Sequence, residues 1–347
     1  MSDTRYLDWP FFEPRHVQMQ RELDAWAREH ISQDAHADVD GECRALVAAL
    51  GDGGWLAHAV AGTAYGGTSE VLDTRALCLM RETLARHSGL ADFAFAMQGL
   101  GSGAISLHGT PGQKDRYLNR VARGTAIAAF ALSEPEAGSD VAAMGCEARI
   151  DGEHAVLNGE KTWISNGGIA DFYVVFARTG EPPGPRGITA FMVDTGKPGF
   201  HRGKTEPKLG IRASATCEIE FQDYVATADE VLGVEGEGFK IAMGVLDAGR
   251  IGIASQAIGI ARAAYEATLE YVKDRKAFGA AIGTFQMTQA KIADMKCKLD
   301  AALLLTLRAA WVKGQGGKFS NEAAIAKLTA SEAAMWITHQ AVQIHGG

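Results

Sequence analysis

The segment SEPEAGSD, residues 133–140, brings hydroxyls, carboxylates and a turn shaped by proline and glycine together at the end of an apolar run. Ser133, Ser139 and the backbone N–H groups of such a turn are suited to hydrogen-bonding the edge of a neutral heterocycle. A phosphate-binding loop is a poorer interpretation, because G-x-x-x-x-G-K-[ST] and G-x-G-x-x-G are absent and Glu134 and Glu136 would repel a phosphate. Taken alone, the octet is more typical of a polar strand end.

Four later segments accompany it, in the order NGEKTWISNGG (158–168), PKLGIRASATCEIEF (207–221), YVKDRKAFGAAIGTFQ (271–286) and AVQIHGG (341–347). Together with SEPEAGSD they resemble the acyl-CoA dehydrogenase family, whose patterns are [ST]-E-P-x-A-G-S-D, N-G-x-K-x-W-I-[ST]-N, K-x-G-x-R-x-S, R-x-x-F-G-x-x-[IL]-x-x-F-Q and Q-I-x-G-G. The resemblance spans essentially the whole chain. Several motifs in the right order are far more specific than any one of them.

The resemblance implies an oxidoreductase with FAD as its cofactor. It would remove two hydrogens from the α and β carbons of an acyl-CoA thioester, with a base taking the α proton and the flavin taking the β hydride. The electrons would pass to electron-transfer flavoprotein. Two alternatives stay open: an acyl-CoA oxidase or flavin monooxygenase on the same fold, and a catalytically silent relative that only binds acyl-CoA or flavin.

The first two motifs would hold the flavin ring. The resemblance implies cofactor contacts there from Phe130, Leu132, Ser133, Gly138, Ser139, Trp163, Ile164 and Ser165. Leu132 and Ser133 would supply hydrogen bonds to the polar edge of the ring, and Ser139 would also contact the pyrophosphate region of CoA. Without the flanking match, Trp163 would be read as an ordinary tryptophan of a β core.

The last two motifs would hold the pyrophosphate and adenosine end of FAD in a neighbouring subunit, which implies a homo-oligomer, most often a tetramer. The residues concerned are Arg275, Phe278, Gln286, Gln343, Ile344, Gly346 and Gly347. A guanidinium suits this task because it can donate two hydrogen bonds to phosphate oxygens. Considered alone, Arg275 would be a solvated charge at a helix end.

Asp247 and Arg250 are the candidate contacts for CoA. They lie three residues apart in a helical pattern, so they share a face and could equally form an ordinary ion pair. The resemblance implies instead that they touch the pantetheine and adenine portions of the substrate. Both interpretations remain open from the sequence.

No catalytic base can be identified. Most family members carry the catalytic glutamate in Y-E-G-[ST] shortly after Q-I-x-G-G, and this sequence reaches Gly347 without that motif. A branch of the family places the glutamate where this chain has Gly249, and Asp247 lies on a different helix face from that position. Glu134 and Glu136 match loop residues. We therefore expect the base to lie beyond Gly347 and the sequence to lack its native C-terminal segment.

The elements that must position these residues fall into three zones, which predict an α+β multidomain fold. Helical spacing of apolar residues predicts a helical domain over 1–125, and a C-terminal helical bundle, expected to be incomplete, over 237–347. Residues 126–236 predict an antiparallel β domain resembling a sandwich or barrel. Its strands are expected at HAVLNG, KTWISNG, DFYVVFAR, ITAFMVD and TCEIEFQDY, with turns at DGE, NGE, NGG and PPGP. Small residues in the first C-terminal helix predict close helix packing, at Ala254, Ala257, Gly259 and Ala261.

Bulk composition agrees with a globular protein that acts on a small molecule. Of 347 residues, 47% are hydrophobic and 22% charged, and the formal net charge of -8 disfavours nucleic-acid and anionic-membrane partners. Ten histidines are scattered, so no metal is expected. Five widely spaced cysteines predict buried thiols rather than disulfides, at Cys43, Cys78, Cys146, Cys217 and Cys297. The N-terminus does not resemble a signal peptide, which predicts a cytoplasmic protein.

The length of the acyl group cannot be read from the sequence. In the family, the pocket floor comes from helices around GLADFAFAMQGLG (89–101), where Phe93, Phe95 and Met97 are bulky. Such residues are more often plain core. If they do line a pocket, they would favour short, branched or alicyclic acyl groups.

Overall fold

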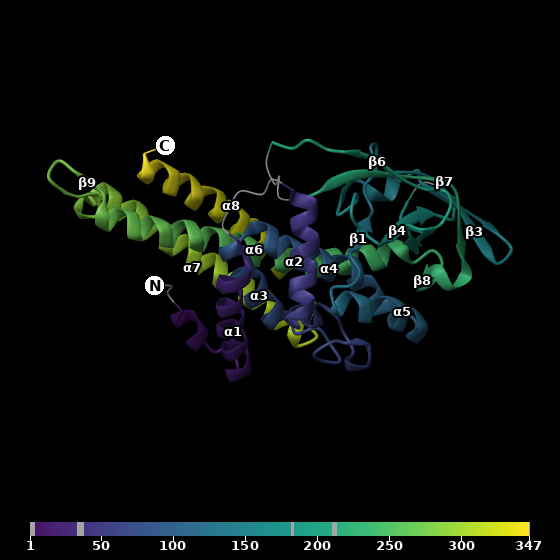
Figure 1. Cartoon of the computed structure of the whole chain (residues 1–347), viewed down its shortest axis with the longest axis horizontal. Helices are drawn as coiled ribbons and strands as arrows, with labels where there is room; N and C mark the ends of the chain where they lie inside the picture. Colours follow the sequence, from purple (N-terminus) through teal and green to yellow (C-terminus); the bar gives the residue numbers. More distant parts are fainter. Residues whose placement is uncertain (1–3, 33–37, 182–183, 210–213, 347) are drawn as a thin grey trace. The chain divides into compact units, whose positions relative to one another are not determined.

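The computed structural model describes residues 4–32, 38–181, 184–209 and 214–346 (Figure 1). An N-terminal helical stretch contains α1 (Pro14–His30), α2 (Val39–Asp52), α3 (Thr74–His87), α4 (Gly89–His108) and α5 (Pro111–Ala122). The strands that follow are β1 (Ala128–Ala131), β2 (Glu147–Asp151), β3 (His154–Ser165), β4 (Phe172–Arg178), β5 (Ile188–Asp194), β6 (Phe200–Thr205), β7 (Thr216–Thr227) and β8 (Val231–Leu232). The chain returns to helix in α6 (Gly238–Asp274), α7 (Gln286–Gly314) and α8 (Ser320–His345), with a small hairpin of β9 (Lys276–Ala277) and β10 (Ala280–Ala281) after α6. This order confirms the predicted fold class.

Contacts divide the chain into two compact units. The first comprises Met1–Gln33, Asp73–Asp92 and Asp247–Gly347, and the second comprises Asp34–Leu72 and Phe93–Leu246. Each unit therefore combines segments that are distant in sequence. The predicted bounds of the three domains remain a prediction.

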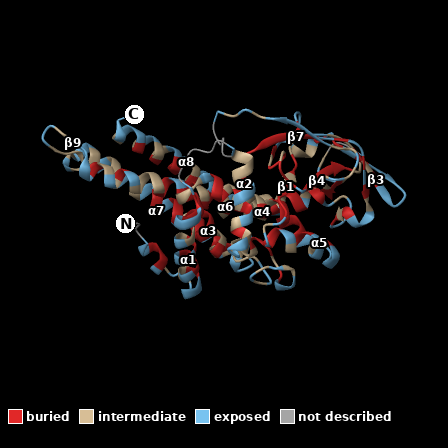
Figure 2. Cartoon of the chain, viewed as in Figure 1, coloured by how far each residue is buried: buried red, intermediate tan, exposed pale blue. Residues whose placement is uncertain are grey.

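The second unit is built around one mixed sheet. Its strands follow the order β6-β7-β3-β2-β4-β5-β8, and β1 joins by pairing with β4 in parallel, with Phe130 opposite Val174. The prediction of an antiparallel domain is thus right for most pairs but wrong for two, because both β1 and β2 pair with β4 in parallel. All seven residues of β4 are buried, as expected for a central strand covered on both faces (Figure 2). β1 pairs with β4 at residues 172–175 and also contacts β3, with which it forms no ladder.

One of the predicted turns does not exist, and it lies within β3. We expected a turn at NGE between two short strands, but β3 runs unbroken from His154 to Ser165. Gly159 instead sits in a bulge with φ 134°, where the register against β7 shifts. A Cβ on this residue would lie 2.8 Å from the Cα of Cys146, so the close approach of the two backbones requires glycine. Gly159 therefore does mark an irregularity of the backbone, but the irregularity is a bulge within a strand and not a turn.

The first unit is a helical assembly in which α3 packs against both α1 and α7, and α7 packs against α8. The small residues predicted for close packing are buried at Ala254, Ala257 and Ala261. At Gly259 a Cβ would lie 2.3 Å from the carbonyl oxygen of Glu82, so α6 and α3 touch backbone to backbone. An N-terminal helix thus packs among the C-terminal ones, which sequence zoning could not show.

Ion pairs buried inside this unit replace part of its apolar core. Arg81 donates two hydrogen bonds to Asp92, at 2.8 and 2.7 Å, and Arg262 donates to Glu82 at 2.6 Å. A guanidinium facing a carboxylate in this way satisfies both charges as they leave water. The helices are therefore held in register by directional contacts as well as by packing.

Two sequence expectations need separate comment. Four cysteines are buried as predicted, but Cys297 is exposed on α7, so the prediction of a buried thiol is wrong there. One helix of the described part of the chain, α6, is long and apolar enough to span a membrane, a test that buried core helices also pass. The expectation of no membrane role stays a prediction.

Candidate functional site

The end of β1 and the end of β3 meet in the second unit. The N–H of Thr162 donates to the carbonyl oxygen of Ser133 at 2.9 Å, which joins SEPEAGSD directly to NGEKTWISNGG. Ser133 is half-buried, whereas Leu132 before it is buried. Two motifs that the sequence shows only as separate strings therefore form one structure.

The first glutamate of SEPEAGSD has a structural task. Glu134 is buried, and its carboxylate accepts hydrogen bonds from the N–H of Gly145 at 2.6 Å and of Cys146 at 3.1 Å. Its backbone pairs with Ala137 in both directions, at 3.2 and 3.1 Å, which closes a tight turn. Glu136 lies exposed in that turn. The octet therefore contains one carboxylate turned into the protein and two, those of Glu136 and Asp140, exposed to solvent.

Sequence reasoning missed Lys161, which completes this arrangement. Its side chain is fully buried, and its ammonium donates to Glu134 Oε1 at 2.6 Å and to the Leu132 carbonyl oxygen at 3.2 Å. The sulfur of Met144 lies 3.9 Å from the same nitrogen. A lysine in a strand is usually expected at the surface, so its residue type gave no signal of burial.

Trp163 is presented outward by a second irregularity in β3. Its backbone has φ 59°, the register against β7 shifts between Lys161 and Ile164, and 60% of the residue is exposed. A left-handed conformation is unusual for a bulky residue and persists only where the surroundings impose it. The alternative interpretation as a core tryptophan is therefore wrong.

The surroundings of this bulge are tied to β1. Asn166 is buried with φ 61°; its side-chain amide donates to the Ala128 carbonyl oxygen at 3.3 Å, and its N–H donates to Ala215. Gln98 on α4 accepts from the Ala128 N–H at 3.0 Å, and its own amide nitrogen is buried without a partner among the described residues. Neither residue was singled out from the sequence.

The remaining predicted residues of this region differ in exposure. Phe130 is half-buried and packs on Phe176, with ring centroids 4.9 Å apart. Ile164 is buried and Ser165 half-buried, opposite Cys217 and Thr216 of β7. Gly138 and Ser139 lie exposed, and a Cβ on Gly138 would meet no protein atom within 4 Å. The protein's own packing therefore does not require glycine there.

The thiol of Cys146, beside the Glu134 carboxylate, is not poised to react. Burial raises the pKa of Cys146 to about 11, although the nearby charge of Lys161 opposes this. The group therefore stays protonated at neutral pH, and a thiolate nucleophile is excluded.

In the first unit, the hairpin after α6 carries the fourth motif. Arg275 and Gln286 are exposed, and Phe278 is fully exposed with φ 51°. The ring of Phe278 has Phe285 as an edge-on neighbour at 6.3 Å, which leaves its other surfaces uncovered within the described chain. A fully exposed phenylalanine in a strained backbone conformation is the kind of outlier that points to an external contact.

The final motif lies beside this hairpin. The ring of His345 stacks on Tyr271, which precedes the hairpin at the end of α6. Gln343 is exposed, Ile344 is half-buried and Gly346 ends α8 with φ 100°. Gly347, also predicted to contact the cofactor, lies outside the described residues. The structure thus brings together the two motifs predicted for the adenosine end.

Asp247 and Arg250 form the ion pair that their spacing allowed, and the hydroxyl of Ser320 donates to the same aspartate at 2.5 Å. Their contacts with CoA remain a prediction. Gly249 between them has no side chain to act as a base, and a Cβ there would meet no protein atom within 4 Å. Within the described ranges, no three His, Cys, Asp or Glu side chains gather to hold a metal ion.

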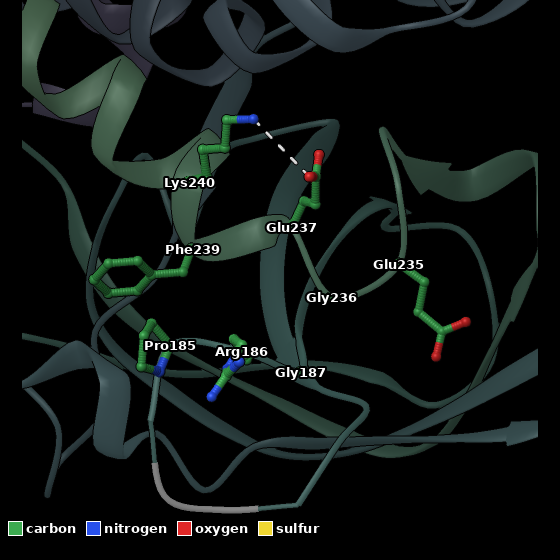
Figure 3. Close-up of a pocket in the computed structure, with 8 residues that line it drawn as sticks. All are labelled: Pro185, Arg186, Gly187, Glu235, Gly236, Glu237, Phe239 and Lys240. Carbon is green, nitrogen blue, oxygen red and sulfur yellow. Dashed lines mark ion pairs between the residues drawn. The ribbon is translucent and has the colours of Figure 1, made fainter.

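A pocket of about 450 Å³ opens where the loop before β5 meets the start of α6 (Figure 3). It is lined by Pro185, Arg186, Gly187, Glu235, Gly236, Glu237, Phe239 and Lys240. The Phe239 ring and the Glu235 carboxylate lie on opposite sides, and Lys240 pairs with Glu237 at 3.9 Å. The charges on its wall are of both signs, so we assign it no ligand.

Three family models match consecutive parts of the chain. They are described as the N-terminal, middle and C-terminal domains of acyl-CoA dehydrogenase, and they match residues 13–125, 129–224 and 236–347. All three domains are therefore represented, and the expectation of a missing C-terminal segment is not borne out. The C-terminal model covers α6, α7 and α8; α3 packs against α6 and α7, and α8 packs against α7.

Curated relatives agree with this match. The chain is 46% identical over 243 residues to a short-chain specific acyl-CoA dehydrogenase of Clostridium acetobutylicum, covering 70% of this chain and 64% of the relative. It is 45% identical over 286 residues to the short-chain specific enzyme of Megasphaera elsdenii, covering 82% of this chain and 75% of the relative. The first match thus spans less than two thirds of the relative's length.

Solved structures share the whole fold. Butyryl-CoA dehydrogenase from Megasphaera elsdenii matches with a TM-score of 0.89 and 36% identity, over 97% of this chain and 89% of that one. A chain from a study of the electron transferring flavoprotein of Acidaminococcus fermentans matches with a TM-score of 0.89 and 38% identity, over 97% and 88% of the two chains.

Proposed function

Because the chain belongs to the acyl-CoA dehydrogenase family, we propose that it catalyses the FAD-dependent α,β-dehydrogenation of an acyl-CoA thioester to the 2-enoyl-CoA. The observation that carries the proposal is the junction of Ser133 with Thr162, beside the outward-facing Trp163. It offers hydrogen-bonding groups and an exposed aromatic face at one place. This combination suits the edge and the face of a flavin ring.

The conformation and exposure of two aromatic residues fit a bound FAD. Trp163 and Phe278 are exposed aromatics held at φ 59° and 51°, and each lies in a motif that the resemblance assigned to the cofactor. Their own unit leaves much of both rings uncovered. The flavin end would be held by Phe130, Leu132, Ser133, Gly138, Ser139, Trp163, Ile164 and Ser165. The adenosine end would be held by Arg275, Phe278, Gln286, Gln343, Ile344, Gly346 and Gly347.

When bound, FAD supplies an acceptor for the hydride that leaves the β carbon. The chain's own contribution is to bind and orient. Ser133 would donate to the polar edge of the ring, and Trp163 would exclude water from one side of it. Ser139, Asp247 and Arg250 would orient the CoA portion of the substrate.

The α proton requires a base that no described residue is assigned to provide. Gly249 lacks a side chain, Asp247 is paired with Arg250, and Glu134 is bound to Lys161 and two backbone N–H groups.

We propose a short-chain acyl-CoA as the substrate class, because the relatives at 45–46% identity are described as short-chain specific. Phe93 and Met97 on α4 are half-buried and so can line a cavity, whereas Phe95 is buried in the core. Bulky side chains at the first two positions would shorten a pocket and favour small acyl groups.

The partners follow from the same relationship. We propose that electrons pass to electron-transfer flavoprotein, since a structural neighbour comes from a study of such a protein. A homotetramer is proposed because the adenosine-end motifs would serve a neighbouring subunit. Exposed apolar side chains on α7 and α8, including Met287, Trp311, Leu328 and Met335, are suited to subunit contacts. A cytoplasmic location remains a prediction.

Anaerobic titration of the FAD-loaded protein with butyryl-, hexanoyl-, octanoyl- and isovaleryl-CoA tests the function. We expect butyryl-CoA to bleach the visible absorption of the flavin most strongly. If the protein binds flavin and CoA esters but no ester bleaches it, the dehydrogenase proposal fails and the silent relative takes its place. Rapid reoxidation by oxygen after bleaching would instead favour the oxidase or monooxygenase alternative.

A further inference from the structure

We propose that Lys161 is a positioning residue for the flavin, acting through the peptide group that joins Leu132 to Ser133. The inference rests on the proposed function, which assigns that peptide to the polar edge of the ring. Its basis is the hydrogen bond from the buried Lys161 ammonium to the Leu132 carbonyl oxygen, at 3.2 Å.

The carbonyl oxygens of two consecutive residues, Leu132 and Ser133, both accept hydrogen bonds from β3. The Lys161 ammonium donates to the Leu132 oxygen at 3.2 Å, and the Thr162 N–H donates to the Ser133 oxygen at 2.9 Å. The N–H of Ser133 belongs to the same peptide group as the Leu132 carbonyl. It donates no hydrogen bond within the described part of the chain. The peptide is thus fixed at its acceptor end and free at its donor end.

A positive charge that binds the carbonyl oxygen of a peptide group makes the N–H of the same peptide group a stronger hydrogen-bond donor. Hydrogen bonds in a chain polarise one another, and the effect is larger in a dry environment, where Lys161 is fully buried. The Ser133 N–H is therefore a better donor than an ordinary amide. Such a donor stabilises negative charge more than neutral charge, and a flavin gains electron density on reduction, so Lys161 favours the reduced form.

Glu134 makes the burial of this charge possible. A buried ammonium is costly unless it is paired and its hydrogen bonds are satisfied, and Glu134 accepts from it at 2.6 Å. The same carboxylate holds the N–H groups of Gly145 and Cys146. The turn is therefore fixed at both ends, which keeps the Leu132–Ser133 peptide in one orientation.

The chain offers a matched control in the same unit. Lys197 pairs with the buried Glu230 at 2.6 Å, the same separation, and Glu230 also accepts a backbone N–H, that of Thr227. Neither Lys197 nor Glu230 belongs to a motif assigned to the cofactor. The Lys197 side chain is 31% exposed, so replacing it should cost less stability than replacing the buried Lys161. It breaks a lysine–glutamate pair of the same length without touching the Leu132–Ser133 peptide.

The test compares K161M, K161M/E134Q, E134Q and K197M by their dissociation constant for FAD, flavin midpoint potential and thermal unfolding. We expect K161M to weaken FAD binding about tenfold or more, as for loss of a charge-assisted hydrogen bond, and to lower the midpoint potential. K161M/E134Q removes the ion pair without leaving an isolated buried charge. It therefore provides the FAD affinity and midpoint potential of a protein without Lys161 if K161M fails to fold. E134Q removes only negative charge and should raise the potential, whereas K197M should keep both flavin properties of the wild type.

Opposite shifts of potential in K161M and E134Q are not expected from a lysine that merely stabilises the turn. Wild-type affinity and potential in K161M/E134Q, or unshifted potential in E134Q, would overturn the inference. Flavin that binds to the wild type but is not bleached by any acyl-CoA defeats the proposed function alone, because affinity and potential still report on Lys161. A wild-type chain that takes up no FAD defeats both.

Discussion

The imidazole of His345 stacks on the ring of Tyr271, with centroids 4.1 Å apart and planes 14° apart. The Tyr271 hydroxyl also donates to the His345 carbonyl oxygen at 3.3 Å. This contact joins the last turn of α8 to the end of α6. It connects Q-I-H-G-G with the segment of α6 that leads into Arg275 and the hairpin.

Tyr271→Leu should therefore loosen the last turn of α8. Loss of the ring contact is expected to cost about 0.5 to 1.5 kcal/mol, confined to this helix end. Hydrogen exchange of the amides at 341–346 should speed up, and FAD should bind several-fold more weakly. His339→Ala, at an exposed position on the same helix, is the control and should change neither. Unchanged exchange in Tyr271→Leu would show that the stacking does not hold this segment.

Trp163→Leu should separate cofactor binding from stability. The residue is 60% exposed, so the free energy of unfolding of the apoprotein should change by less than about 0.5 kcal/mol. FAD affinity should fall by about three- to tenfold, as for loss of an aromatic contact. Titration of flavin fluorescence measures this, with Trp26→Leu, at a half-buried position on α1, as the control. Equal affinity for FAD in wild type and Trp163→Leu would remove Trp163 from the site.

Gly159→Ala should destabilise the β domain. The residue has φ 134°, and the added methyl would lie 2.8 Å from the Cα of Cys146. Strained backbone and a steric clash together predict a loss of at least about 2 kcal/mol in the free energy of unfolding. Gly138→Ala is the control, since its Cβ meets no protein atom within 4 Å. Similar urea midpoints for the two variants would contradict the assignment of a glycine-dependent bulge.

Asp73 should make the free energy of unfolding depend on pH in the acid range. Burial alone would raise its pKa, but hydrogen bonds from His16 and the Ala76 N–H, with the charges of His16 and Arg15, lower its pKa well below the usual range. A carboxyl with a lowered pKa stabilises the fold above its unfolded value of about 4, and this is lost as the pH falls through the folded value.

Asp73→Asn should thus lower the free energy of unfolding at pH 7, by about 1 to 3 kcal/mol for the lost charge-assisted hydrogen bonds. The difference from wild type should shrink at pH 3, where the carboxyl of the unfolded chain is mostly protonated while the native carboxyl is still ionised. Urea unfolding at both pH values measures it, and Asp38→Asn, at the exposed cap of α2, should cost less at pH 7. A difference that grows on acidification would contradict the expected sign.

Gly249→Glu tests the alternative base position. Open space around a Cβ at 249 predicts that the variant folds normally. If the resemblance places this residue correctly, the new carboxylate should accelerate flavin reduction by acyl-CoA about tenfold or more, as general bases do. Gly249→Gln has the same shape without a base and is the control in stopped-flow reduction. Equal rates in the Glu and Gln variants would show that position 249 does not face the α carbon.

The sequence by itself determined the family, the order of helical and β zones and the residues that carry the motifs. These are local properties: apolar periodicity selects helix or strand, and motif spacing does not depend on how distant segments meet. Gly259 and its small neighbours also predicted close helix packing, because the absence of a side chain limits what can approach. The same reasoning failed at Gly159, since turns and bulges use the same residue for the same freedom of φ.

Only the tertiary structure decided which polar groups are buried and what they hold. Lys161 and Glu134 look like surface residues in the sequence, and their burial follows from β1 and β3 meeting and from a partner that neutralises each charge. Trp163 looks like core, and a shift of register in β3 turns it to the surface. Burial and pairing depend on contacts between residues far apart in the chain, so no local pattern could have revealed them.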